Sequence, residues 1–197
     1  MKLDPAHACA LLDRLKLATE AADVQALTDE VLDFLRTQLE ALREQANGYP
    51  RGAINMGVWT AGGDLASLAD ALADELHQRQ LPKPEELASR LATALAFQVM
   101  SHYPQEIFPR VLRNARCREA IGDLPEAIGC YEAIVADYAE LALEQDWLEP
   151  GAETTEEWNW VALDAVHAAA GRLTELAVGE VDRWRNIRDR IDRARVP

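Results

Sequence analysis

Apolar residues recur every three or four positions along most of the chain, and no segment alternates apolar and polar residues with a period of two. The first spacing places apolar side chains on one face of an α-helix, whereas a half-buried strand requires strict alternation. Alanine and leucine, both strong helix formers, occupy many of these positions. The sequence therefore predicts an all-α fold, a helical bundle or a short solenoid-like array of about seven helices.

Residues that start and stop helices divide this pattern into segments. Asp4 followed by Pro5 is typical of an N-cap and the first helical position, and Asn47-Gly48 is typical of a helix end. The last apolar stripe continues across Gly179, so a single helix, bent at most at this glycine, is expected there. The expected helices span residues 4–19, 23–46, 64–79, 84–102, 108–121, 124–147 and 155–194.

The chain is long enough to bury a core as a single helical domain spanning 1–197. A proline-marked break near 103–107 offers a possible internal division. On that division, the N-terminal helices occupy 4–102 and a second, repeat-like part occupies 108–197.

The segment 47–63 holds five of the chain's ten glycines and has no strong periodicity. Irregular connections longer than about 12–15 residues are uncommon in compact domains and are often functional. Two interpretations stay open, a structural crossover and a functional segment. A short helix around 53–59 is compatible with both.

The net charge of −14 argues against a nucleic-acid partner, because phosphate binding needs a positive surface. No stretch approaches about 18 apolar residues and the start is not leader-like, so we expect no membrane partner and a cytoplasmic location. Cys9, Cys117 and Cys130 lie far apart without a metal-binding spacing and are expected to be reduced thiols. Residues 180–197 differ from the rest, with six arginines against four acidic residues.

Residues 122–131 read Gly-Asp-Leu-Pro-Glu-Ala-Ile-Gly-Cys-Tyr and lie between two amphipathic stretches. A glycine permits a tight turn, and small residues such as Ala115 and Ala127 let two helices cross closely, with Tyr131 beside them. The segment 108–141 thereby resembles one tetratricopeptide repeat, a helix–turn–helix unit of about 34 residues. The resemblance implies a helical hairpin completed by its neighbours, because one repeat cannot bury its own faces.

The sequence departs from the family's pattern at Asn114, where leucine is expected, and at Arg118, where a large apolar residue is expected. The resemblance implies peptide or protein binding along the first helix of the hairpin. The contacts that it implies are Leu112, Arg113, Arg116 and Glu119. Ordinary charges on a solvated helix face are the other interpretation. We expect a non-enzymatic interaction module, such as an adaptor, chaperone-like or regulatory protein, with a protein or peptide partner and no cofactor.

Two Asp-x-x-His patterns occur, Asp74 with His77 and Asp164 with His167. An acid and a histidine three positions apart share a helix face, and helical bundles build metal sites from such pairs. A complete site also needs further inward carboxylates. We therefore expect exposed or hydrogen-bonded histidines and no bound metal, and keep these four residues as the metal candidates.

The alternative function is a divalent-metal-dependent all-α phosphohydrolase or another helical-bundle metalloenzyme. Such enzymes bind Mg²⁺ through carboxylates one turn apart on neighbouring helices. Glu30 with Asp33, and Asp70 with Asp74, have a suitable spacing, but solvated helix faces also produce it frequently. The sequence contains no P-loop, HExxH or GxSxG motif, so we lean towards a protein that is not an enzyme.

The C-terminal apolar stripe is the candidate for self-association. It consists of Val181, Trp184, Ile187 and Ile191. The stripe continues past the point where the chain has other helices to cover it, so we expect a homodimer through a partner helix. A structural homo-oligomer subunit is the second alternative function. The competing interpretation is a helix that folds back over the chain's own first two helices. Arginines on the other face are expected to pair with acids one turn away, Arg188 with Asp192 among them.

Overall fold

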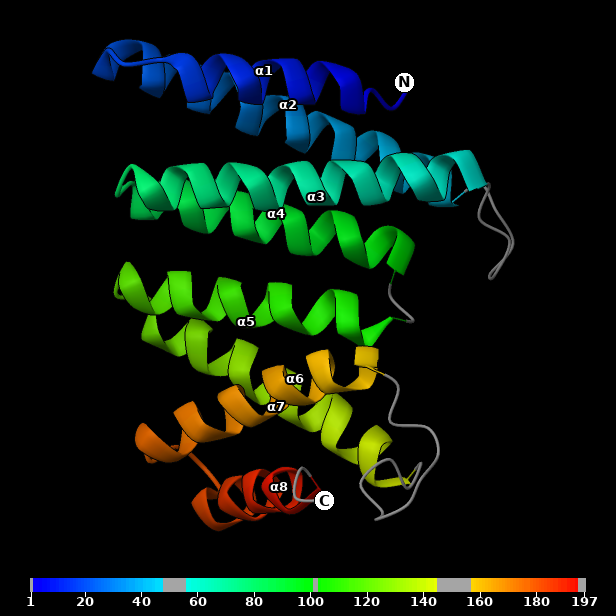
Figure 1. Cartoon of the computed structure of the whole chain (residues 1–197), viewed down its shortest axis with the longest axis vertical. Coiled ribbons are helices and arrows are strands. Elements are labelled where there is room, and N and C mark those ends of the chain that lie inside the picture. Colours follow the sequence, from blue (N-terminus) through cyan, green and yellow to red (C-terminus); the bar gives the residue numbers. More distant parts are fainter. Residues whose placement is uncertain (1, 48–55, 101–102, 145–156, 195–197) are drawn as a thin grey trace. The chain divides into compact units, whose positions relative to one another are not determined.

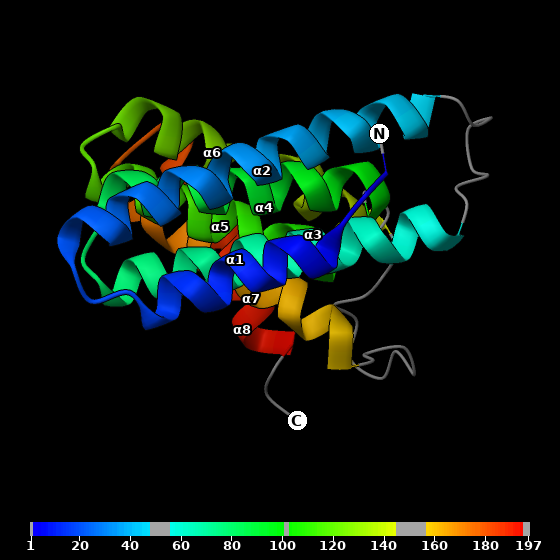
Figure 2. The same cartoon turned by 90° about the horizontal axis from the view of Figure 1, so that it is seen from above.

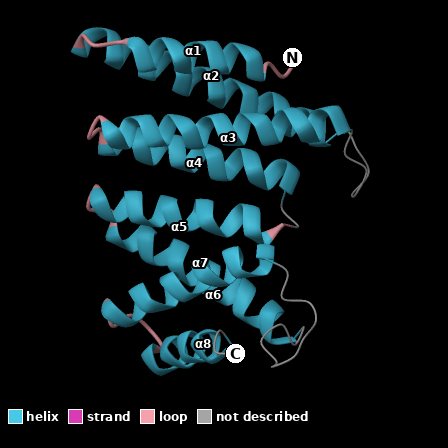
Figure 3. Ribbon diagram, viewed as in Figure 1, coloured by secondary structure: helices cyan, strands magenta, loops and turns pink. Residues whose placement is uncertain are grey.

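The computed structural model describes residues 2–47, 56–100, 103–144 and 157–194, and all regular structure within these ranges is helical (Figure 3). The all-α prediction is confirmed. The described residues form eight helices rather than about seven. These are α1 (Pro5–Leu17), α2 (Ala21–Asn47), α3 (Met56–Gln78), α4 (Pro82–Met100), α5 (Pro104–Ala120), α6 (Leu124–Glu144), α7 (Glu157–Glu175) and α8 (Val181–Ala194).

The chain divides into two compact units, and each holds four helices. Unit 1 is Met1–His102 and unit 2 is Tyr103–Pro197. In unit 1, α1 packs on α2 and α3 packs on α4 (Figure 1), and Figure 2 shows α1 alongside α3. In unit 2, α5 packs on α6 and α8 packs on α7, while α7 also contacts both α5 and α6. Each unit is therefore two helical hairpins whose first helices contact each other.

The start of α1 follows directly from its sequence. The Asp4 carboxylate accepts a hydrogen bond of 3.0 Å from the backbone N–H of His7, and Pro5 occupies the first helical position. The predicted N-cap is confirmed. The side chains that α1 buries are Ala8, Leu11, Leu12 and Leu15. Their spacing of three or four positions is the one that indicated a helix in the sequence.

Helix α3 begins at Met56, well before the expected start at Asp64, so the expected boundary was wrong. Gly62 explains the difference. A Cβ atom at Gly62 would lie 2.7 Å from Cγ1 of Val99 on α4, closer than real Cβ contacts. The glycines of this stretch therefore allow a close helix contact rather than form a loop. Residues 48–55 of the glycine-rich segment lie outside the described residues.

The last helical stretch is two helices, not the single helix expected over 155–194. Helix α7 ends at Glu175 and α8 begins at Val181. Ala177 has a φ of 53°, and the N–H of Val178 donates to the Leu173 carbonyl at 3.2 Å. This geometry is a Schellman helix end, in which the left-handed position is usually glycine. The helix end was missed because alanine occupies that position.

The apolar stripe of α8 is part of the core of unit 2. Trp184, Ile187 and Ile191 are 5%, 7% and 1% exposed, and Val181 is half-buried. Helix α8 packs on α7, and the Trp184 indole N–H donates to the Val178 carbonyl at 2.9 Å. The expected dimer interface depends on a stripe that no helix of its own chain covers. That premise does not hold for these residues.

Candidate functional site

A cleft of about 480 Å³ opens in unit 2 and is lined by side chains from all four of its helices. The lining residues are Leu112, Arg116 and Glu119 of α5, Tyr131 of α6, His167, Ala168, Gly171, Arg172 and Glu175 of α7, and Arg188 of α8. The α5 residues are four and then three positions apart, so they share one helix face. Since α5 and α7 are in contact, their faces meet at this cleft.

Both carboxylate oxygens of Glu119 are hydrogen-bonded by neighbouring helices. The Tyr131 hydroxyl donates to Oε2 at 2.7 Å. Arg172 donates through Nη2 to Oε1 at 2.7 Å and through Nε to both oxygens at 3.1 Å. Arg172 also donates through Nη1 to Oε2 of Glu175 at 2.7 Å. These bonds join α5, α6 and α7 along one wall of the cleft.

The protonation states of these groups follow from their surroundings. The hydrogen bonds from Arg172 hold the pKa of Glu119 below its usual range. Burial, followed by the hydrogen bond to Glu119, raises the pKa of Tyr131 above its usual range. The same pairing with Glu119 raises the pKa of Arg172. At neutral pH the wall therefore consists of an ionised Glu119, a charged Arg172 and a neutral Tyr131 that acts as donor.

Two arginines in the cleft lack close carboxylate partners. Arg116 is exposed and makes no hydrogen bond or ion pair with another described residue. Within the described residues, the ion pair of Arg188 is a loose one, 3.8 Å from Oδ1 of Asp189. Asp192, the expected partner of Arg188, instead lies 3.0 Å from Nε2 of His167. Arg116 interacts electrostatically with Glu119 but without a hydrogen bond, so Arg116 and Arg188 both keep N–H donors that are not bonded to a carboxylate of the cleft.

The structure brings together three of the four contacts implied by the repeat resemblance. Leu112, Arg116 and Glu119 line the cleft, whereas Arg113 is half-buried and does not line it. From the sequence, His167 of α7 was considered only as a metal candidate and Arg188 of α8 only as an ion-pair partner, although both line the cleft. Tyr131 was treated only as a packing residue, and Arg172 was not singled out. No local signal marks Arg172, because its role depends on how α7 packs against α5.

The departures from the repeat pattern form a polar cluster within the α5–α6 hairpin. Arg118 donates through Nε to Oδ1 of Asn114 at 2.9 Å and through Nη1 to Oε2 of Glu126 at 2.9 Å. Asn114 is 5% exposed, so the bond from Arg118 Nε satisfies a buried amide oxygen. Ala115 and Ala127, the residues expected at the helix crossing, are both fully buried. Asn114 and Arg118, the two polar residues at positions where the repeat pattern expects apolar ones, thus satisfy each other by a hydrogen bond.

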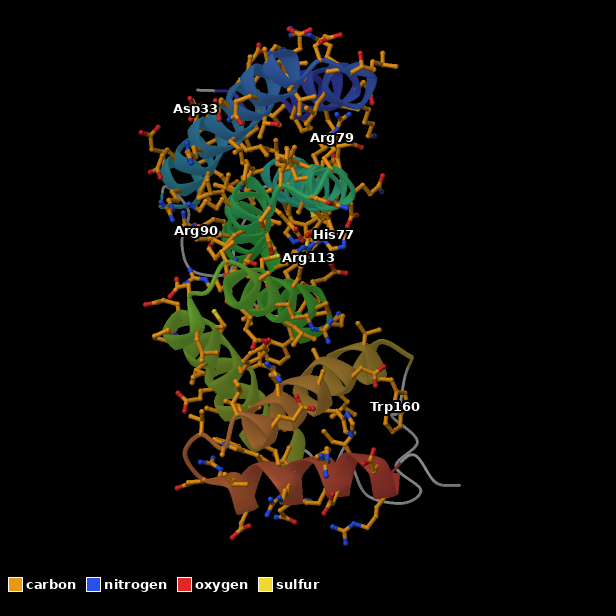
Figure 4. The ribbon with its side chains drawn as sticks, turned by 90° about the vertical axis from the view of Figure 1, so that its left-hand side faces the viewer. Asp33, His77, Arg79, Arg90, Arg113 and Trp160 are labelled. Atoms are coloured by element: carbon orange, nitrogen blue, oxygen red, sulfur yellow. The ribbon has the colours of Figure 1, made fainter. Side chains whose placement is uncertain are left out.

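The metal candidates are divided between the two units. Asp74 and His77 belong to unit 1, whereas Asp164 and His167 belong to unit 2. Nδ1 of His77 lies 3.2 Å from both carboxylate oxygens of Glu85, and its side chain is exposed (Figure 4). Among the described residues, no three His, Cys, Asp or Glu side chains are grouped so that they could hold a metal ion.

Glu30 and Asp33, one of the carboxylate pairs considered for Mg²⁺, each lie near an arginine. Oε1 of Glu30 lies 3.6 Å from Nη1 of Arg14, and Oδ1 of Asp33 lies 2.7 Å from Nη1 of Arg36. All four side chains are largely exposed. These contacts are typical of solvated helix faces, where such ion pairs contribute little to stability.

No helix within the described residues is long and apolar enough to cross a membrane. Comparison of the chain with protein-family models, with curated proteins and with solved structures finds no match.

Proposed function

We propose that the chain is a non-enzymatic module that binds a peptide or a segment of a partner protein in the cleft of unit 2. One observation carries the proposal. The first helices of two successive hairpins, α5 and α7, line a single cleft that also contains two arginines without close carboxylate partners. Such a module would serve as an adaptor, a chaperone-like protein or a regulatory protein.

The size and chemistry of the cleft support binding. Ligand pockets commonly enclose about 300–1,000 Å³ and combine apolar surface with a few oriented polar groups. Here Leu112, Ala168 and Gly171 supply the apolar surface, and the Glu119–Arg172 pair supplies oriented polar groups. A wall already held by hydrogen bonds loses little conformational freedom when a ligand binds.

The repeat resemblance supports the same site. In tetratricopeptide repeats the first helix of each unit lines the binding surface, and α5 occupies that place in this hairpin. The neighbouring α7–α8 hairpin contacts α5 and α6 through α7. It thereby supplies the adjacent packing that a single repeat needs.

Gly171 offers a direct test, because an added Cβ meets no atom within 4 Å. Gly171→Leu would fill the cleft, and leucine is a better helix former than glycine. The matched control is Gly129→Leu on the exposed face of α6, where an added Cβ is equally unobstructed. We expect peptides selected from a displayed random library on the wild type to bind Gly171→Leu about tenfold more weakly or worse, and Gly129→Leu normally.

Fluorescence anisotropy with the selected peptides measures both affinities. Circular dichroism confirms that each variant is folded. The proposal fails if the library yields no binding peptide, or if both leucine variants bind as well as the wild type.

A further inference from the structure

The charged groups in the cleft differ in how completely they are paired. Arg172 is bonded to both Glu119 and Glu175, the two acidic residues that line the cleft. Arg172 offsets only one of their two negative charges, and Arg116 interacts electrostatically with Glu119 without a hydrogen bond. Three arginines and two glutamates line the cleft, so one positive charge is in excess. Arg116, from α5, and Arg188, from α8, are the arginines that are not hydrogen-bonded to either glutamate.

A basic ligand fits this arrangement poorly. The oxygens of Glu119 already accept hydrogen bonds from Arg172 and Tyr131, so an incoming ammonium group would compete with bonds that are in place. It would also approach Arg116 and Arg188, and like charges in contact weaken binding. A neutral ligand would leave both guanidinium groups without a carboxylate hydrogen-bonded to them.

We infer that the cleft selects acidic peptide segments, whose side-chain carboxylates accept hydrogen bonds from Arg116 and Arg188. This inference rests on the proposed function. A guanidinium group presents parallel N–H donors that match the two oxygens of a carboxylate, and such charge-assisted bonds are stronger than neutral ones. The side chain of Arg188 is 38% exposed, so part of it is already withdrawn from water before a ligand binds.

The chain's net charge of −14 does not oppose this selection strongly. Interactions between exposed charges are largely screened beyond about 8 Å at physiological ionic strength. The groups in contact with the ligand therefore determine which peptide binds. Arg172 is a positioning residue here, because it fixes Glu119 and leaves the ligand to the other two arginines.

The composition of the selected peptides is the first measurement. Peptides that bind the wild type and lose affinity for Gly171→Leu should contain more Asp and Glu than Lys and Arg. Arg116→Gln and Arg188→Gln should each weaken the binding of a selected acidic peptide about tenfold or more. Arg185→Gln is the control, because Arg185 lies on α8 outside the cleft and pairs with Asp182 at 3.3 Å.

The possible results separate the inference of acidic selection from the proposed peptide-binding function. Neutral or basic peptides that still depend on Gly171 would overturn acidic selection and leave the proposed function standing. Acidic peptides whose affinity is unchanged in Arg116→Gln and Arg188→Gln would also overturn it. A library that yields no peptide would overturn the proposed function itself.

Discussion

In unit 1, Arg79 directly follows α3 and donates hydrogen bonds to three backbone carbonyls at the end of α1 (Figure 4). In unit 2, Arg172 lies in the last turn of α7 and donates to the carboxylate of Glu119, in the last turn of α5. Both arginines join the third helix of a unit to its first. Each also bonds a glutamate of the third helix, Glu75 for Arg79 and Glu175 for Arg172. The acceptors on the first helix differ.

That difference separates a structural contact from a contact within a site. The last carbonyls of a helix have no partner within the helix, so Arg79 completes α1 by bonding those of Lys16 and Ala18. The Leu15 carbonyl also accepts from the Ala18 N–H at 3.1 Å. These carbonyls do not titrate. Glu119 does titrate, lines a cleft and also accepts from Tyr131. Similar helix packing thus supports stability in one unit and a polar wall in the other.

The largest expected loss of stability comes from a substitution on α8, the fourth helix of unit 2. Helix α4 buries eight residues, whereas α8 buries only Trp184, Ile187 and Ile191. Ile191→Asp places an unpaired charge at a position that is 1% exposed, and it should destabilise unit 2 by about 4 kcal/mol or more. Urea denaturation and light scattering measure the result. A stable, folded monomer from a dimeric wild type would instead identify the stripe as an interface.

The two arginines should have similar effects on stability and different effects on binding. Arg79→Ala and Arg172→Ala each remove charge-assisted hydrogen bonds, and each should cost about 1.5–3 kcal/mol. Only Arg172→Ala should weaken peptide binding. Arg36→Ala, which removes an exposed ion pair with Asp33, is the control and should change stability by less than about 1 kcal/mol. Equal loss of binding in Arg79→Ala and Arg172→Ala would remove the distinction between the units.

Gly62 in unit 1 lies where two helices pack closely, whereas Gly129 in unit 2 has free space beside it. Gly62→Ala brings a methyl group within 2.7 Å of Val99 and 3.2 Å of Leu42, and it should cost about 1–2 kcal/mol after the gain in helix propensity. Gly129→Ala meets nothing within 4 Å and should instead stabilise the protein by about 0.5–1 kcal/mol. Thermal denaturation decides between them. A stabilised Gly62→Ala would show that α3 and α4 are farther apart.

Ala177→Gly should stabilise unit 2 by about 1 kcal/mol, because alanine pays a steric cost at its φ of 53°. Gly122→Ala should destabilise it by a similar amount, since Gly122 has a φ of 86°. The N–H of Asp123 donates to the Arg118 carbonyl at 2.8 Å, the bond expected at such a helix end. Urea denaturation of both variants tests the pair. The two substitutions should change the free energy of unfolding in opposite directions. A destabilised Ala177→Gly variant would contradict the left-handed backbone geometry at residue 177.

Acid should affect unit 2 through Glu119. A carboxyl whose pKa is lowered by folding adds stability that is present above its unfolded pKa, about 4.5, and is lost as the pH falls through its folded pKa. Because protonated Glu119 can still accept hydrogen bonds, the loss is expected to be about 1 kcal/mol. Urea denaturation at a series of pH values should show a shallower acid-induced loss for Glu119→Gln. Parallel profiles would mean that Arg172 does not hold this carboxylate.

Local chemistry made much of the fold predictable. The Asp4-Pro5 start and the Gly122-Asp123 turn each depend on a few adjacent residues, and both were correctly placed. The errors arose where distant packing overrides local preference. Gly62 lies inside a helix because α4 approaches it closely, and Ala177 takes a conformation that usually marks glycine.

Only the α5 side of the candidate site could be predicted from the sequence, again because packing between distant segments determines the rest. The face formed by Leu112, Arg116 and Glu119 follows from helical spacing within α5. Arg172 lies 53 positions from Glu119, and no spacing rule connects two residues that far apart. Arg188 was expected to pair with Asp192, but Oδ1 of Asp192 instead lies 3.0 Å from Nε2 of His167 on α7. Tertiary packing, rather than sequence spacing, determined which charges remained available.

The position of Arg79 also has a consequence for synthesis of the chain. Its hydrogen-bond acceptors at Ala18 and Leu15 lie 61 and 64 positions earlier. At a ribosomal rate of about 5–20 residues per second, α1 leaves the peptidyl-transferase centre roughly 3–12 s before the arginine that completes it. During that interval, water must solvate the last carbonyls of α1. We expect a nascent chain that stops before Arg79 to carry an α1–α2 hairpin that frays readily and is open to proteases.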